Sequence, residues 1–357
     1  MCRQLDDYRL LGRSGLRVSP LSLGAMTFGM PAEWGSTDAE AARIVDHYVD
    51  RGGNFIDTAN FYGSGGSESV LAPLIRHRRE RMVIATKYSL TMCPGDPNAS
   101  GNHRKNMVQA VEASLRRLGT DYIDLLYLHI WDGRTPVEEI LRAFDDLARA
   151  GKIIHAGISD TPAWQISRMQ AIADLRGWTP LVALQIPYSL VERTVEREFM
   201  PMAAEMGLGV LPWSPLGGGV LTGKYTRKDL VLADQAELQK LDSRKKINLA
   251  TGRLSERALS IADEVAAIAA EMEKSPAQVA LAWTLLNPAV TSPIIGVRTL
   301  KQLEENLEAL SISFSDDQKA RLDAVSAIDP TFPYPMIPSN HETGMMFGNV
   351  KVETRRR

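Results

Sequence analysis

The sequence predicts a single (β/α)8 barrel, an α/β fold of the TIM-barrel type, from three observations. Eight short apolar runs alternate with segments of helical periodicity, and no shift in composition divides the chain. Short, nearly continuous apolar runs are typical of strands buried on both faces of a parallel sheet. A chain of 357 residues can form one such barrel, because α/β barrels use ~250 residues or more as one domain. The eight runs are 21–25, 54–57, 82–87, 124–129, 153–159, 182–185, 209–212 and 290–295.

A β-hairpin and three clearly bounded helices are predicted in addition. Residues 8–19 form the hairpin, around a tight turn that contains two glycines. The helix at 37–51 carries its apolar residues on one face and has Thr37 as its N-cap. The helices at 104–118 and 136–150 each stop just before a glycine, as helix C-termini commonly do.

An open, doubly wound sheet is the competing fold. Such a sheet usually carries a phosphate-binding turn with GxGxxG spacing after its first strand. The first run leads instead into GAMTFG at 24–29, which lacks that spacing and favours the barrel. We expect the barrel to span residues 1–329, with a long loop at 214–252 after the seventh strand. Residues 330–357 form a proline-rich tail that either lies over the barrel mouth or is disordered.

Composition argues against several classes of protein. A formal net charge of −2 and a pI near 6.3 argue against a nucleic-acid or membrane-surface partner. Cys2 and Cys93 cannot form a disulfide framework or a zinc site, and no run approaches the ~18 apolar residues of a membrane span. The N-terminus does not resemble a secretory signal, so we expect a soluble cytoplasmic protein. Whether it forms a homo-oligomer is left open.

Polar side chains end several predicted strands, at the end of the barrel where active sites lie. Asp57, Lys87 and His129 each close an apolar run, and Tyr62 lies in the loop after Asp57. A buried lysine needs a counter-charge, which Asp57 on the neighbouring strand can supply. A nearby cation lowers the pKa of a tyrosine, which helps the hydroxyl to protonate a carbonyl oxygen. The group therefore fits carbonyl reduction, with a hydride from a nicotinamide or flavin because no side chain can supply one.

Five segments together resemble the aldo-keto reductase superfamily, in particular its channel β-subunit-like and aryl-alcohol-dehydrogenase-like branches. They occur in family order from about Tyr8 to about Leu310. They are GNFIDTANFYG (53–63), IATK (84–87), DYIDLLYLH (121–129), LPWSPL (211–216) and PIIGVR (293–298).

The resemblance implies a catalytic tetrad. Tyr62 is then the general acid, Lys87 lowers its pKa, Asp57 holds Lys87, and His129 orients the substrate carbonyl. The resemblance also implies NADPH bound without a Rossmann domain. The implied cofactor-binding residues, from the nicotinamide to the adenine, are Ser159, Asp160, Gln185, Trp213, Ser214, Leu216, Gly218, Lys224, Arg298, Gln302, Glu305 and Asn306.

One residue departs from the family pattern. The position after the serine is usually Asn, and here it is Asp160. An ionised carboxylate accepts hydrogen bonds but cannot donate one to the nicotinamide carboxamide oxygen. We therefore expect nicotinamide binding to differ in detail, with the reaction class unchanged.

The predicted substrate is a small aldehyde or ketone, reduced reversibly to an alcohol. Met26, Trp34, Tyr88 and Trp131 follow strand ends and are candidates to line its pocket. Two other functions are weighed. An NADPH-binding regulatory subunit of a membrane channel would keep the same tetrad but turn over slowly. A metal-dependent barrel hydrolase is disfavoured, because the six histidines include no His-x-His pair, and no metal site is predicted.

Overall fold

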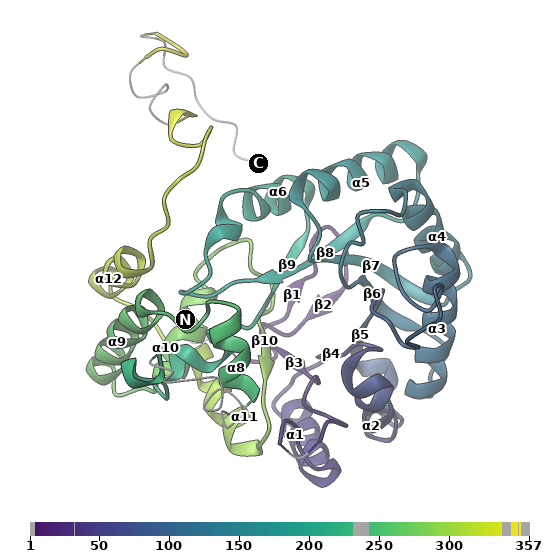
Figure 1. Cartoon of the computed structure of the whole chain (residues 1–357), viewed down its shortest axis with the longest axis horizontal. Helices are drawn as coiled ribbons and strands as arrows, with labels where there is room; N and C mark the ends of the chain where they lie inside the picture. Colours follow the sequence, from purple (N-terminus) through teal and green to yellow (C-terminus); the bar gives the residue numbers. More distant parts are fainter. Residues whose placement is uncertain (1–3, 32, 231–242, 338–343, 349, 351–357) are drawn as a thin grey trace.

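Eight parallel strands form one sheet that curves into a barrel (Figure 1). The computed structural model describes residues 4–31, 33–230, 243–337, 344–348 and 350. The order of the strands in the sheet is β10-β3-β4-β5-β6-β7-β8-β9, and a parallel bridge between Val210 and Val290 joins the two ends of the sheet. The predicted (β/α)8 barrel is confirmed. The strands are β3 (Ser22–Gly24), β4 (Phe55–Asp57), β5 (Val83–Tyr88), β6 (Ile123–Leu128), β7 (Ile153–Ser159), β8 (Leu181–Pro187), β9 (Gly209–Trp213) and β10 (Ile294–Gly296).

Helices surround the strands, as Figure 1 shows. Thr37 caps the first helix, accepting a hydrogen bond from the Glu40 N–H as predicted. The helices are α1 (Asp38–Asp50), α2 (Gly66–Ile75), α3 (Arg104–Leu118), α4 (Val137–Arg149), α5 (Ala163–Arg176), α6 (Phe199–Met206), α8 (Ser243–Ala250), α9 (Glu256–Glu271), α10 (Pro276–Thr284), α11 (Leu300–Leu307) and α12 (Asp316–Ser326). Short 3-10 helices lie at Tyr62–Gly65, Arg79–Arg81, Thr194–Glu196, Gly217–Thr222, Arg227–Leu230 and Glu308–Ser311.

The N-terminal hairpin closes the amino-terminal end of the barrel. Its strands are β1 (Arg9–Leu10) and β2 (Arg17–Val18), paired antiparallel as predicted. Leu11 and Val18 are fully buried and pack with the apolar side chains of the barrel interior. The other end of the barrel is therefore the one open to a ligand.

Side chains alternate between the barrel interior and the layer under the helices. Val83 and Ala85 of β5 belong to the interior cluster, whereas Ile84 and Tyr88 belong to the cluster between sheet and helices. Successive side chains of a strand point to opposite faces, so Lys87 continues the interior series. The same two-residue spacing runs from Phe55 to Asp57 on β4. The barrel interior is therefore apolar toward the amino ends of the strands and polar at their carboxyl ends.

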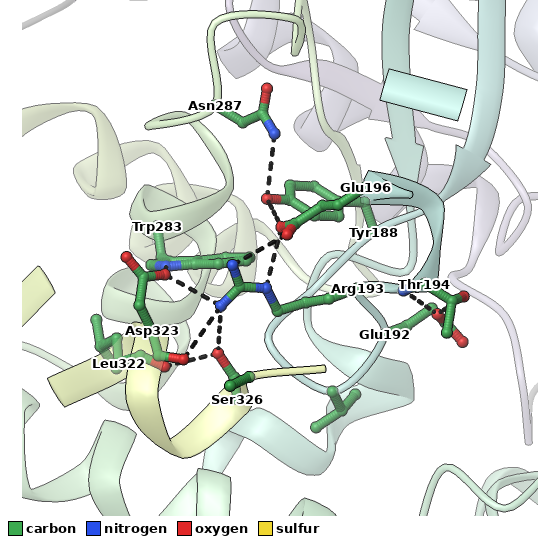
Figure 2. Close-up of polar contacts among 12 residues, drawn as sticks. Tyr188, Glu192, Arg193, Thr194, Glu196, Trp283, Asn287, Leu322, Asp323 and Ser326 are labelled. Carbon is green, nitrogen blue, oxygen red and sulfur yellow. Dashed lines mark hydrogen bonds and ion pairs between the residues drawn. The ribbon is translucent and has the colours of Figure 1, made fainter. Parts of the chain in front are cut away.

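A polar cluster centred on Arg193 ties the segment after β8 to α10 and α12 (Figure 2). The Arg193 guanidinium donates to both carboxylate oxygens of Glu196 at 3.0 Å, and Tyr188 Oη donates to Glu196 at 2.7 Å. Its third nitrogen donates to Asp323 and Ser326 of α12, at 3.1 and 2.8 Å. The guanidinium also lies 4.9 Å from the ring centre of Trp283. This cluster, called the Arg193 cluster below, fixes residues 188–193 beside the barrel mouth.

The described part of the tail extends beyond α12, away from the barrel (Figure 1). Its apolar side chains are exposed, with Phe332 at 80% and Met336 at 52%. The predicted boundary after residue 329 and a role for the tail over the mouth stay predictions, and residues 338–343, 349 and 351–357 lie outside the described residues. None of the described helices is both long and apolar enough to span a membrane.

Candidate active site

The Lys87 ammonium is the centre of the polar residues at the mouth. Lys87 and Asp57 are buried, and Lys87 Nζ lies 2.5 Å from Asp57 Oδ1. The same ammonium donates to the Thr58 carbonyl oxygen at 2.8 Å and to Tyr62 Oη at 3.2 Å. The three N–H donors of the ammonium thus each have one acceptor. Together these three hydrogen bonds fix the ammonium beside the tyrosine hydroxyl.

A sharp turn after β4 places Tyr62. Tyr62 begins the 3-10 helix Tyr62–Gly65, in which Gly63 has a left-handed φ of 58°. A Cβ atom at Gly63 would lie 2.6 Å from the Gly29 carbonyl oxygen, so the turn packs against the loop after β3. The close packing holds the phenol over the Lys87 ammonium, 4.7 Å from the ring centre.

Opposing effects set the pKa values of this pair. Burial raises the pKa of Tyr62 and the Lys87 ammonium lowers it, with a net direction upward. Burial lowers the pKa of Lys87, but Asp57 and Tyr62 raise it further, so the lysine stays charged. The sequence predicted a lowered pKa for Tyr62, because the nearby Lys87 can be inferred from the sequence and the burial of the tyrosine cannot. The hydroxyl therefore keeps its proton at neutral pH, with the cation ready to stabilise the phenolate.

His129 lies directly after β6, where its backbone N–H donates to the Tyr88 carbonyl oxygen at 3.0 Å. Its ring meets Tyr62 edge-on, with ring centres 5.9 Å apart. Burial, and then the Lys87 charge, lower the pKa of His129 to about 3. The imidazole is thus neutral over the working pH range. Within the described residues its buried Nδ1 has no hydrogen-bond partner.

Comparison with known proteins assigns the family. The model of the aldo/keto reductase family matches residues 20–327. The chain belongs to this family. It is 38% identical to the uncharacterized oxidoreductase YrpG of Bacillus subtilis, over 87% of this chain and 93% of that protein. It is 35% identical to norsolorinic acid reductase of Aspergillus flavus, over 92% and 83%. It is 34% identical to aryl-alcohol dehydrogenase [NADP(+)] of Phanerodontia chrysosporium, over 90% and 86%.

The residues expected at the nicotinamide lie at the ends of β7, β8 and β9. Gln185 is buried and donates from Nε2 to Asp57 Oδ2 at 2.8 Å, so it also orients the lysine's counter-charge. Ser159 is buried at the end of β7. Asp160 follows in the left-handed region with φ of 33°, and its Oδ1 accepts from Trp213 Nε1 at 3.2 Å. The three strand ends therefore converge beside Lys87.

The glycine turn after β9, called the glycine cradle below, contains residues that the sequence predicts to bind the cofactor. Gly218 and Gly219 have φ of 67° and 88°, in the left-handed region. A Cβ atom at Gly219 would lie 3.0 Å from Lys224 Nζ, and one at Gly218 would lie 2.3 Å from Asn248 Oδ1. A glycine backbone directly beneath a lysine ammonium fits a phosphate group. Ser214, with φ of 51°, and the half-buried Leu216 begin this turn.

A second basic position lies at the start of α11. The Arg298 N–H donates to Gln302 Oε1 at 2.8 Å, and its exposed guanidinium donates to the Glu33 carbonyl oxygen at 3.3 Å. Glu305 and Asn306 follow Gln302 on the same face of α11, because residues three and four apart are neighbours on a helix. An arginine at a helix N-terminus fits a second phosphate, as a phosphorylated dinucleotide requires.

The structure brings three of the four expected pocket residues to loops at the mouth. Met26 is 40% exposed, Trp34 faces the Arg244 guanidinium at 5.3 Å, and Trp131 follows His129 by two residues. Tyr88 is placed elsewhere. It is fully buried, donates to the Asn102 carbonyl oxygen at 3.1 Å and packs on Phe144 of α4, because it follows Lys87 directly and faces the opposite side of the sheet.

Three residues at the mouth were not predicted from the sequence. Trp164 of α5 is 63% exposed and meets Trp131 edge-on, with ring centres 5.8 Å apart. The Arg253 guanidinium lies 5.0 Å from the ring centre of Trp213, and the two line one pocket with Ser214 and Gly217. Asn248 of α8 donates to the Gly218 carbonyl oxygen at 3.1 Å. In the described part of the chain, no three His, Cys, Asp or Glu side chains gather as a metal site would need.

Proposed function

We propose that this aldo/keto reductase reduces aldehydes or ketones with NADPH, and that Tyr62 is the general acid. The observation that carries the proposal is the Lys87 ammonium, held between Asp57 Oδ1 and Tyr62 Oη at 2.5 and 3.2 Å. A protonated phenol beside a fixed cation can release its proton and keep the resulting charge stabilised. Relatives named norsolorinic acid reductase and aryl-alcohol dehydrogenase [NADP(+)] support the same reaction.

Tyr62, Lys87 and His129 have separate roles in the proposed reaction. A nicotinamide cofactor held at the ends of β7, β8 and β9 would supply the hydride for the carbonyl carbon. Tyr62 Oη gives its proton to the carbonyl oxygen, and Lys87 stabilises the phenolate that remains. His129, held neutral, offers an N–H to the same oxygen and orients it. In the reverse direction Tyr62 takes the alcohol proton back, so the rate of oxidation should rise with pH.

Arg298 and the glycine cradle favour NADPH as the cofactor. Gly218, Gly219 and Lys224 would hold the pyrophosphate, and Trp213 would face the nicotinamide. Arg298 at the start of α11 would bind the adenosine 2′-phosphate, for which a guanidinium is well suited. We therefore expect NADPH to bind more tightly than NADH.

Aromatic aldehydes are the substrates that the mouth fits best. Trp131 and Trp164 form an edge-to-face pair beside His129, and Trp131 Nε1 is buried without a partner among the described residues. Aromatic rings pack favourably against such pairs. The same two tryptophans leave a polar atom for a ring substituent of the substrate.

The test is consumption of NADPH with a panel of aryl and aliphatic aldehydes, together with calorimetric titration of NADPH. Turnover with aryl aldehydes, lost in Tyr62→Phe while NADPH still binds, is the expected result. Tight NADPH binding without turnover on any aldehyde would point to the regulatory subunit instead. Absence of NADPH binding would contradict the proposal altogether.

A further inference from the structure

Asp160 joins three strand ends at the mouth. Its Oδ1 accepts from Trp213 Nε1 of β9 at 3.2 Å, and its carbonyl oxygen accepts from the Trp131 N–H after β6 at 3.3 Å. Its backbone, with φ of 33°, lies in the left-handed region that Asp and Asn tolerate better than most residues. The backbone of Asp160 is therefore held by the loop after β6, and its carboxylate by the Trp213 indole of β9.

No direct ion pair neutralises this carboxylate. Among the described residues, no Lys, Arg or His nitrogen lies within 4.0 Å of it. The net shift in the pKa of Asp160 is upward, because loss of water raises it by more than the Trp213 hydrogen bond, Lys87 and Arg253 lower it. Lys87 is already paired with Asp57 at 2.5 Å. The charge of Asp160 in turn raises the pKa of Tyr62, so it acts at the place where the substrate reacts.

The two oxidation states of a nicotinamide cofactor differ in charge at the ring. The oxidised ring carries one positive charge and the reduced ring none, while the phosphates and the adenosine are the same. A fixed carboxylate beside the ring attracts only the oxidised form, whereas the neutral asparagine that is usual here does not discriminate by charge. The residue that departs from the family pattern is thus the one that can distinguish the two states.

We propose that Asp160 makes the cofactor site selective for the oxidation state, favouring NADP+ over NADPH. The proposal rests on the proposed function, because it requires the nicotinamide to lie beside Trp213 and Lys87. Two unit charges a few ångströms apart at a protein surface give a preference of about tenfold or more. By the same thermodynamic cycle, the equilibrium between the bound states is drawn toward the reduced substrate and the oxidised cofactor.

The test is the ratio of the two dissociation constants, for NADPH and NADP+, measured by calorimetry without substrate. The ratio cancels every contact with the phosphates and the adenosine, which both cofactors share. We compare the wild type with Asp160→Asn and Asp160→Ser. Asp174→Asn is the control, because it removes the same charge from the far end of α5, where Asp174 pairs with Arg13 at 3.2 Å. Asparagine also adopts the left-handed backbone, and thermal melting verifies that each variant folds.

We expect both Asp160 variants to weaken NADP+ relative to NADPH by about tenfold, and the control to leave the ratio unchanged. An unchanged ratio in Asp160→Asn and Asp160→Ser, with both cofactors bound, would overturn the proposal. A shift in Asp160→Asn alone would overturn it too, because the new N–H donor and not the lost charge would then be responsible. Failure of the wild type to bind either cofactor would instead contradict the proposed function.

Discussion

Lys87, Asp57 and Tyr62 form a network at the barrel mouth, called the Lys87 network here. Like the Arg193 cluster beside it, this network joins a cation, a carboxylate and a tyrosine hydroxyl, but the two differ in what surrounds them. The Arg193 guanidinium uses its Nε and both terminal nitrogens on Glu196, Asp323 and Ser326 (Figure 2). Beside Lys87, the buried His129 Nδ1 has no partner among the described residues.

The difference separates a structural cluster from a chemical one. Buried polar groups in proteins are almost always hydrogen-bonded, so an unpaired buried nitrogen beside a fixed cation and a tyrosine hydroxyl points to a ligand. The Arg193 cluster is complete and stabilises the segment after β8. The Lys87 network is complete only up to Tyr62 Oη, which accepts from Lys87 and donates to no described residue. Substitutions in the Lys87 network should therefore lower activity, and those in the Arg193 cluster should lower stability while leaving activity nearly unchanged.

Removing one tyrosine hydroxyl from each region gives the largest contrast. Tyr62→Phe should lower kcat for carbonyl reduction by about 10²- to 10⁴-fold, because it removes the general acid. Its affinity for NADPH should stay unchanged. Tyr188→Phe, in the Arg193 cluster, should change kcat by no more than about twofold and lower the free energy of unfolding by about 1 kcal/mol. Steady-state kinetics and urea denaturation measure both. Equal losses of kcat in the two variants would remove the distinction between the regions.

Removing the cation from each region should separate them by stability. Lys87→Met leaves the buried Asp57 carboxylate, whose side chain is 3% exposed, without its counter-charge. The free energy of unfolding should fall by about 3–5 kcal/mol. Arg193→Met leaves Glu196 and Asp323, which are 23% and 55% exposed and can be hydrated, so a loss of about 1–2 kcal/mol is expected.

A double variant verifies the cause at Lys87. Lys87→Met combined with Asp57→Leu should recover part of the stability, because no charge is left buried, without recovering activity. A double variant as unstable as the single one would show that packing, and not the unpaired carboxylate, controls the loss.

His129 makes stability depend on pH. Its pKa is about 3 in the folded protein, against an ordinary value of 6.5, so the unfolded chain binds a proton that the folded protein does not. Stability should be unaffected above pH ~6.5 and should fall by about 1–2 kcal/mol as the pH drops to ~5. His129→Gln should remove this part of the slope in urea denaturation. For the same reason the pH profile of kcat/KM for reduction should show no inflection near 6.5. An inflection there that disappears in His129→Gln would mean that the imidazole is more accessible to water than its burial indicates.

The sequence was sufficient for the fold and for much of the mouth. Alternating apolar runs predicted all eight strands, and their last polar residues predicted where Asp57, Lys87 and His129 meet. The same alternation, applied one residue further, would have placed Tyr88 on the outer face of the sheet. The pKa direction of Tyr62 was not predictable, because burial outweighs the Lys87 charge and no sequence pattern shows its extent.

Other residues at the mouth come from segments whose position depends on tertiary packing. Asn248 lies within the long segment predicted as a loop after β9 and Arg253 directly follows it, and no spacing in the sequence links them to Trp213 or Gly218. Trp164 offered a weak signal, since it follows Asp160 by four residues at the start of a helix. An exposed tryptophan next to a strand end is a feature that sequence reasoning can use elsewhere.

The smallest expected effect tests that tryptophan. Trp164→Ala removes an exposed ring that meets Trp131 edge-on at 5.8 Å. We expect KM for aryl aldehydes to rise by about three- to tenfold, the value of one aromatic contact, and KM for aliphatic aldehydes to change little. Leu175→Ala is the matched control, because Leu175 is 85% exposed at the opposite end of the same helix. A rise in KM that is equal for both substrate classes would assign Trp164 to shaping the mouth and not to recognising the ring.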